Sequence, residues 1–271
     1  MKRKQIKIKS NNNSPDELWL YGKHPVFSAI QSQKREIHKI IVSKNSAIDL
    51  EKFIDKIKNS LDSKFYHKLV SNLEITDINK IDNLVGKNNL HQGLIANCSC
   101  LPINDQFNLL TELYKISEAE QELPNLLLLD QLSDPQNIGA IIRSAISFGI
   151  TKIVFTKHNS PKENATMIKS SAGTIENAEL FEVVNFSNLL EKLKELGYWS
   201  IGLEGTSKTQ ISNLKGYKNI ALVVGSEGSG IRSLVKKNCD ILAKIEISDK
   251  VESLNASVAT AIALYELFGK N

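Results

Sequence analysis

An apolar run near the carboxyl end, Ile220 to Val224, restricts the fold more than any other feature because it ends abruptly in a glycine-rich turn. Short apolar runs bounded by glycine are typical of fully buried strands in parallel sheets. The turn reads Gly225-Ser226-Glu227-Gly228-Ser229-Gly230, and its glycines allow tight bending and leave backbone N–H groups open to a ligand. The pattern predicts a buried strand that leads into a binding loop.

A second strand and a capped helix are expected after this turn. The alternation of Ile241, Ala243, Ile245 and Ile247 predicts a strand over 241–247. An alanine-rich helix should then begin near Ser253 or Asn255, since either side chain can accept a hydrogen bond from a free N–H of the first turn. Strand, turn, strand and capped helix together predict a small-molecule site backed by a sheet.

The glycine turn alone leaves other interpretations open, because such turns are common in α/β proteins. Its order, Gly-x-x-Gly-x-Gly, differs from the Gly-x-Gly-x-x-Gly of dinucleotide sites, and the sequence contains no Gly-Lys-Ser/Thr of a P-loop. A nucleotide-dependent enzyme on an ordinary doubly wound sheet therefore stays an alternative that lacks its usual fingerprints.

The rest of the chain divides into regions of different pattern. From Pro124 onward, apolar runs alternate with helical patterns, which predicts a parallel sheet covered on both faces. Residues 17–101 read as a smaller α/β unit, and 102–123 as a linker with a helical stretch at 106–118. The strands expected in these regions are 37–43, 126–129, 152–156, 181–184 and 198–203, and the helices 49–60, 138–145, 165–173 and 187–196.

Composition excludes several classes of protein. No apolar run approaches the roughly 20 residues that span a bilayer, and the start lacks the apolar stretch of a signal peptide. The three cysteines form neither an even disulfide set nor a zinc pair, and no two of the five histidines have metal-ligand spacing. We therefore expect a cytoplasmic protein with no metal and no membrane segment.

The amino-terminal residues 1–16 form a basic segment despite a formal net charge of only +4 for the whole chain. The first ten residues carry five lysines and arginines and no acid. Such a segment buries too little apolar surface to become ordered, so we expect a disordered tail. It can add phosphate contacts that weaken as salt rises, or it can be a solvated terminus.

Three motifs in order carry a resemblance to a known family. Gly225-Ser226-Glu227-Gly228 and the run from Ser253 to Ala259 resemble the second and third motifs of the SpoU (TrmH) family, and the run from Asp130 to Ala145 resembles the first. Members of this family are RNA 2′-O-ribose methyltransferases that use S-adenosylmethionine. The segments at 21–26 and 91–94 resemble the substrate-binding domain that precedes many catalytic domains of this family and is similar in fold to a ribosomal-protein RNA binder.

The resemblance implies a fold and a set of site residues for the region 124–271. The fold would be an α/β parallel-sheet domain with a deep trefoil knot, and the RNA site would draw on both subunits of a homodimer. Arg143 would act as a base or hold a substrate phosphate, and the residues that would support catalysis with it are Asn137, Glu227, Ser253 and Asn255. The cofactor-binding positions would be Gly225, Ile245, Leu254, Gly202, Leu203 and Gly228.

The chain also departs from the family pattern beside this site. Ile-Pro-Met is common in the family where this chain has Ile245-Glu246-Ile247, and a glycine is frequent near Asp249. These changes predict a more charged pocket rim. The amino-terminal domain resembles the version found in a 23S rRNA guanosine methyltransferase, and this resemblance implies methylation of a guanosine ribose in 23S rRNA, with a tRNA substrate as the alternative within the class. A non-catalytic RNA-binding or assembly protein with this fold is the alternative outside it.

Overall fold

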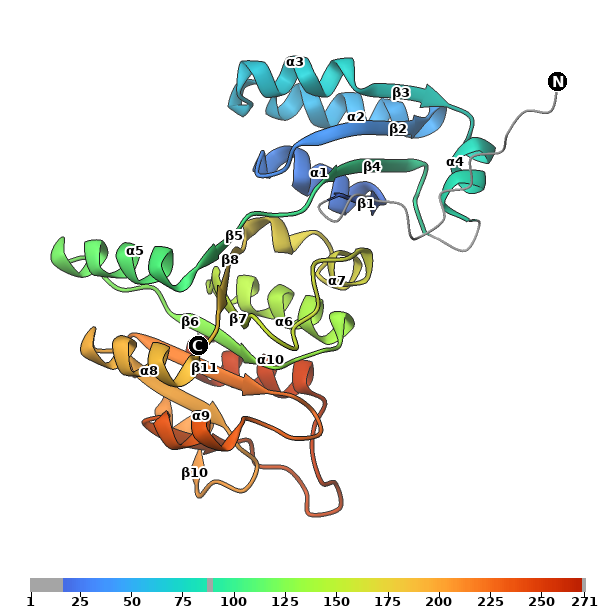
Figure 1. Ribbon diagram of the computed structural model, residues 1–271. Coiled ribbons are helices and arrows are strands. Elements are labelled where there is room, and N and C mark those ends of the chain that lie inside the picture. Colours follow the sequence, from blue (N-terminus) through green and yellow to red (C-terminus); the bar gives the residue numbers. More distant parts are fainter. Residues whose placement is uncertain (1–16, 87–89, 270–271) are drawn as a thin grey trace. The chain divides into compact units, whose positions relative to one another are not determined.

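The computed structural model describes residues 17–86 and 90–269, which form two compact units (Figure 1). The first unit contains the chain up to Pro102 together with Glu163–Glu176, and the second contains Ile103–Lys162 and the chain from Asn177 onward. The expected basic tail at 1–16 lies outside the described residues. The chain therefore crosses between the units at three places rather than one.

The first unit is built on a four-stranded sheet in the order β1-β4-β2-β3, antiparallel except between β2 and β3. The predicted strand at 37–43 is confirmed as β2. The predicted helix at 49–60 begins earlier, because the Ser43 side chain caps it by accepting a bond from the Ser46 N–H at 3.3 Å. The elements are β1 (Glu17–Tyr21), α1 (Lys23–Ser32), β2 (Ile37–Ser43), α2 (Lys44–Ile57), α3 (Ser63–Ser71), β3 (Leu73–Thr76), α4 (Ile78–Val85), β4 (Leu94–Ser99) and α7 (Ala165–Ser170).

A buried ionic cluster joins the two chain segments of the first unit. The Arg35 side chain is 0% exposed and donates from Nε to Glu176 at 2.7 Å and from its terminal nitrogens to Glu163 and to the Ser99 carbonyl. Glu163 also accepts from the Leu101 N–H at 2.8 Å. Burial raises the pKa of Glu176, while Arg35 opposes that effect. One guanidinium thus holds two buried carboxylates that follow it by more than 120 residues in sequence.

The second unit is an eight-stranded sheet in the order β10-β12-β9-β11-β6-β7-β8-β5, in which all pairs are parallel. The strands are β5 (Ile103–Asp105), β6 (Leu126–Asp130), β7 (Lys152–Thr156), β8 (Glu179–Val183), β9 (Trp199–Leu203), β10 (Thr209–Gln210), β11 (Ile220–Gly225) and β12 (Ile241–Lys244). The helices are α5 (Gln106–Glu118), α6 (Pro135–Ser147), α8 (Phe186–Glu195), α9 (Ser233–Asn238) and α10 (Ala256–Phe268).

Helices cover both faces of this sheet, as the alternating pattern predicts (Figure 1). On one face, α5, α8 and α9 pack on a core that includes Leu128, Val154 and Val223. On the other face, α6 and α10 pack against each other, and α10 contacts β11. The segment expected to be a linker supplies β5 and α5, whose Leu109 and Leu113 belong to the first of these cores.

The second predicted strand is shorter than the sequence pattern indicates. β12 ends at Lys244, and Ile245–Ile247 lie in a loop instead of continuing the strand. Pairing partners explain the difference, because β9 ends beside Ala243 and β10 ends beside Lys244. Without a neighbouring strand to supply hydrogen bonds, the backbone after Lys244 leaves the sheet.

We predict that Arg35→Met destabilises the first unit by about 3–5 kcal/mol, because it leaves two buried carboxylates without their cation. Urea unfolding followed by Trp19 fluorescence in a Trp199→Phe background measures this unit separately. A variant that also carries Glu163→Met and Glu176→Met should recover most of the loss, since buried ionic groups can be replaced by apolar ones.

Lys58→Met is the matched control, because its partner Asp55 is 63% exposed and such a pair contributes less than about 1 kcal/mol. An unchanged unfolding midpoint for Arg35→Met would show that the buried cluster does not stabilise the unit.

Candidate active site

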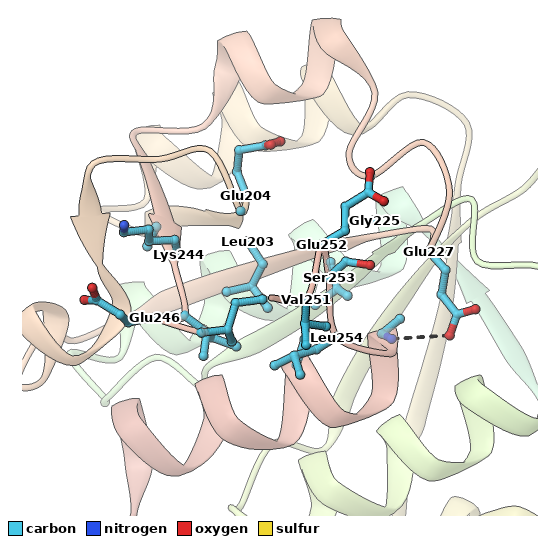
Figure 2. Close-up of a pocket in the computed structure, with 18 of the residues that line it drawn as sticks. Leu203, Glu204, Gly225, Glu227, Lys244, Glu246, Val251, Glu252, Ser253 and Leu254 are labelled. Carbon is cyan, nitrogen blue, oxygen red and sulfur yellow. Dashed lines mark hydrogen bonds between the residues drawn. The ribbon is translucent and has the colours of Figure 1, made fainter. Parts of the chain in front are cut away.

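A cavity of about 380 Å³ lies where β9, β11 and β12 end (Figure 2). In parallel sheets, ligands bind outside the carboxyl ends of the strands. The cavity is bounded by Leu203–Gly205 after β9, by Val224–Glu227 and Gly230 around the end of β11, and by most of the loop between β12 and α10. The predicted site is therefore assembled from strand ends that are adjacent in the sheet but distant in sequence.

The cavity has apolar side chains at its centre and carboxylates around it. Figure 2 shows Leu203, Val251 and Leu254 close together, with Lys244 and Glu246 to one side and Glu227 to the other. The lining holds five carboxylates and one ammonium group, which are those of Glu204, Glu227, Glu246, Asp249, Glu252 and Lys244. The more charged rim expected from Glu246 and Asp249 is present, and it favours a cationic ligand.

Glu204 is the rim carboxylate with a cation of its own. Its carboxylate forms an ion pair with Lys236 and accepts from the Thr206 hydroxyl at 3.0 Å. Burial raises the pKa of Glu204, but these two hydrogen bonds outweigh it and hold that pKa below its ordinary value. Glu204 therefore stays ionised beside the cavity.

A hydrogen-bonded network joins one residue from each of the three motifs. Asn137 donates from Nδ2 to Glu227 Oε1 at 2.8 Å, and Asn255 donates from Nδ2 to Asn137 Oδ1 at 3.0 Å and to the same Glu227 oxygen. The Ala256 N–H at the start of α10 reaches Glu227 as well, at 3.4 Å (Figure 2). Asn255 is the cap of α10, since its Oδ1 accepts from the Ser257 N–H at 2.9 Å. Asn255, not Ser253, therefore fulfils the predicted capping role.

The glycine loop is held against its own backbone. A Cβ on Gly225 would lie 2.1 Å from the Gly230 carbonyl carbon and 2.2 Å from the Ile231 nitrogen. The Ser226 and Gly230 backbones exchange hydrogen bonds at 2.9 and 3.2 Å. The absence of a side chain at Gly225 is thus required by the fold of the loop itself, so a substitution there acts by distorting the loop before it excludes any ligand.

A buried carboxylate anchors the end of this loop. Asp130, at the end of β6, is fully buried and accepts from the Arg232 N–H at 2.9 Å and from its Nε at 2.8 Å. Asp130 belongs to the segment that resembles the first motif, but the sequence alone gave it no role. Its partner follows it by 102 residues, so the pairing has no local signal.

Arg143 lies on the exposed face of α6, six residues beyond Asn137. Among the described residues, no hydrogen bond or ion pair engages its guanidinium. Ser253 lines the cavity and is exposed. The Arg143 guanidinium is thus available to a phosphate, and the Ser253 hydroxyl is available to a ligand in the cavity.

The residues expected to bind a cofactor fall into two groups. Gly225, Ile245, Leu254 and Leu203 line the cavity, whereas Gly202 and Gly228 do not. Gly202 is buried in β9, where a Cβ would meet Leu242, Cys239 and Ile231 within 3.1 Å. The sequence pattern did not single out Glu204, Lys244 or Glu252 as lining residues, although the rule that ligands bind at strand ends points to the first two.

The described ranges 17–86 and 90–269 contain no group of three or more His, Cys, Asp or Glu side chains placed to hold a metal ion. Within the same ranges, no helix has both the length and the apolar character that crossing a membrane requires.

The sheet and its cavity define a parallel-sheet domain that binds a small molecule, and solved structures share this fold. The SpoU methyltransferase AviRb from Streptomyces viridochromogenes, in complex with AdoMet, matches with a TM-score of 0.70 at 18% identity over 93% of this chain and 89% of its own. The AdoMet-bound rRNA methyltransferase from Sinorhizobium meliloti matches with a TM-score of 0.70 at 18% identity, covering 93% of this chain and 86% of its own.

Family models and relatives agree with the fold. The SpoU rRNA Methylase family matches residues 124–265, and the RNA 2′-O ribose methyltransferase substrate-binding model matches residues 19–102. YacO of Bacillus subtilis, assigned to the TrmH family of tRNA/rRNA methyltransferases, is 32% identical over 93% of this chain and 95% of its own length. The chain belongs to the SpoU methylase family of RNA methyltransferases.

We predict that Gly225→Ala raises amide hydrogen exchange across residues 225–232, because the new Cβ displaces the backbone at Gly230 and Ile231. Gly228→Ala is the matched control, since a Cβ there meets no atom within 4 Å. Equal exchange in the two variants would contradict the assigned contact.

Proposed function

We propose that this protein transfers a methyl group from S-adenosylmethionine to a ribose 2′-hydroxyl of RNA. The observation that carries the proposal is the network in which Asn137, Glu227 and Asn255, one residue from each family motif, meet at the edge of the cavity. The AdoMet complexes of two proteins with this fold support the choice of cofactor.

The cavity suits this cofactor in size and charge. Its volume lies within the range of roughly 300–1,000 Å³ that small-molecule sites occupy, and Leu203, Ile245 and Leu254 provide apolar contacts for an adenine. The carboxylate rim is complementary to a sulfonium cation. When bound, S-adenosylmethionine would supply an electrophilic methyl group.

The protein's own residues would then align the ribose and remove one proton. Asn137, Glu227 and Asn255 hold the glycine loop and the start of α10 in place, and Ser253 lies where it can contact the bound substrate. A guanidinium keeps its proton below about pH 12, so the conservative role for Arg143 is to hold the substrate phosphate in a two-pronged contact. In the second role, Arg143 would be the base that takes the proton of the ribose hydroxyl, after the substrate phosphate has helped to deprotonate its guanidinium.

We also infer a homodimer, which α10 supports. This helix is apolar on nearly all sides, and helices of that kind are normally buried. Yet Val258 and Tyr265, two turns apart on one face, are 47% and 58% exposed. A second copy of the chain would cover this face and bring its surface close to Arg143, since α6 packs against α10.

The trefoil knot expected from the resemblance is part of the same proposal. After β9 the chain forms β10 at the edge of the sheet and then β11 on one side of β9, and it continues to β12 between β9 and β10. It returns through the loop at 245–255 to α10, which packs on α6. This path is compatible with a carboxyl-terminal segment threaded through the loops that line the cavity.

The substrate we propose is a guanosine of 23S rRNA, modified in the cytoplasm. The match of residues 124–265 to the SpoU rRNA Methylase family supports an rRNA target, while YacO of Bacillus subtilis is named for both tRNA and rRNA. Mapping 2′-O-methyl groups in rRNA and tRNA from cells with and without the gene tests the proposal. A missing methyl in tRNA would identify the alternative substrate, and no missing methyl in either RNA would favour a non-catalytic role.

Arg143→Lys should lose most of the turnover while S-adenosylmethionine binding stays unchanged, because lysine keeps the charge but not the two-pronged contact. Single-turnover methylation and calorimetry measure the two effects separately. If the site is shared between subunits, a mixture of inactive Arg143→Ala and inactive Gly225→Val proteins should regain activity. A near-normal rate in Arg143→Lys would contradict the proposed role of Arg143 in catalysis.

The carboxylate rim should make S-adenosylmethionine bind more tightly than S-adenosylhomocysteine, whose sulfur carries no charge. Glu246→Gln should reduce this preference by roughly two- to fivefold, as expected for an exposed charge, and rising salt should reduce it further. Calorimetry with both ligands checks this, with the exposed Glu118→Gln on α5 as a control. If Glu246→Gln and the parent protein show the same preference, the carboxylate rim does not discriminate between the two ligands.

A further inference from the structure

A row of side chains crosses one face of the sheet in the first unit. Trp19 of β1 is paired with Asn97 of β4, and Asn97 is paired on its other side with Lys39 of β2. Residues directly opposite each other in antiparallel strands project from the same face. Three strands span roughly 10 Å at about 4.8 Å per strand, so these side chains form a continuous strip that we call the Trp19 row.

The Trp19 row lies next to a part of the sheet that α4 covers. Ile81 of α4 packs with Ile41 and Ile95 in a small core, and Trp19 and Tyr21 pack against it. Burial raises the pKa of Tyr21. Trp19 is only partly buried, so part of its indole faces out of the core.

Lysines lie at both ends of the row. Lys39 shares the Glu74 carboxylate with Lys80, at 2.8 and 2.5 Å, so two ammonium groups face one carboxylate. Their hydrogen bonds lower the pKa of Glu74 to about 2, so it stays ionised and this end keeps a net charge of +1. At the other end, the exposed Lys169 of α7 and Trp19 line a small cavity together.

We propose that the Trp19 row binds an unpaired nucleotide of the RNA substrate. A base stacks on the exposed part of the Trp19 indole, and Lys39 and Lys169 contact the flanking phosphates. The Asn97 Nδ2 donates to the Leu18 carbonyl at 3.4 Å, so its Oδ1 is the atom that accepts a hydrogen bond from the base edge. Single-stranded RNA is recognised by such a combination of aromatic stacking and cations, whereas paired RNA is recognised mainly by its shape. The inference rests on the proposed function, because it identifies how the substrate of that reaction is held.

The chain offers a direct reporter, because its two tryptophans are Trp19 and Trp199. In full-length Trp199→Phe protein, titration with a ten-nucleotide unstructured RNA should quench Trp19 fluorescence. Trp19→Ala should weaken RNA binding roughly 5- to 100-fold, the usual effect of losing one stacked base, whereas Trp19→Phe keeps a ring and should stay within about threefold.

The lysines provide a second readout that does not depend on the core. Lys39→Ala and Lys169→Ala should each reduce the slope of log affinity against log salt by about one ion. Lys58→Ala, an exposed lysine at the end of α2 outside the row, should leave that slope unchanged. Unquenched fluorescence, or parental affinity in both lysine variants, would overturn the proposal.

Different results would refute the Trp19 row and the proposed function. Normal methylation and RNA affinity in Lys39→Ala and Lys169→Ala, without quenching, would refute the Trp19 row and leave the proposed function standing. Quenching by RNA in a protein that methylates neither rRNA nor tRNA would refute the proposed function and support the row.

Discussion

The carboxylate of Glu227 is the group on which the site depends, because it joins its own loop to two other chain segments and has no ion-pair partner within residues 17–86 and 90–269. Its Oε1 accepts from Asn137 on α6, from Asn255, and from the Ala256 N–H at the start of α10. An anion at a helix amino terminus is stabilised by the free N–H groups and the helix dipole. The glycine loop, the first motif and the last helix are therefore fixed relative to one another by amide donors alone, which leaves Arg143 unpaired among the described residues.

Most residues that line the cavity lie in loops, and this explains why the chain can depart from its family at Glu246 and Asp249. Leu203, Ile245 and Leu254 supply the apolar contacts, the first from the end of β9 and the other two from the loop between β12 and α10. The two acids are exposed, so they change the charge of the rim without changing the shape behind it. Such a change acts on the strength of ligand binding and on discrimination between ligands, not on the fold.

The compact units of this protein are not the segments that the two family models match. The methylase model covers 124–265 without interruption, yet Glu163–Glu176 from its middle belongs to the first unit. Arg35 holds that segment through Glu163 and Glu176, with all three side chains almost fully buried. A cut between the segments that the models match would therefore separate the buried Arg35 from Glu163 and Glu176. The first unit thus combines the segment that matches the substrate-binding model with a part of the segment that matches the methylase model.

The local sequence pattern determined most of the helices and strands, because the hydrophobic periodicity of each element can be recognised without knowing what packs against it. The strands at 37–43 and 152–156 match their predictions residue for residue, and the helix predicted at 106–118 is α5. The resemblance to the family motifs indicated Asn137, Glu227 and Asn255 as site residues without information on their contacts. Tertiary structure alone decided where the strand after Ile241 ends, since that depends on the length of β9 and β10. It alone paired Arg35 with Glu176, Asp130 with Arg232, and Trp19 with Asn97, because contacts between residues far apart in sequence leave no periodic signal and exist only once the chain has folded.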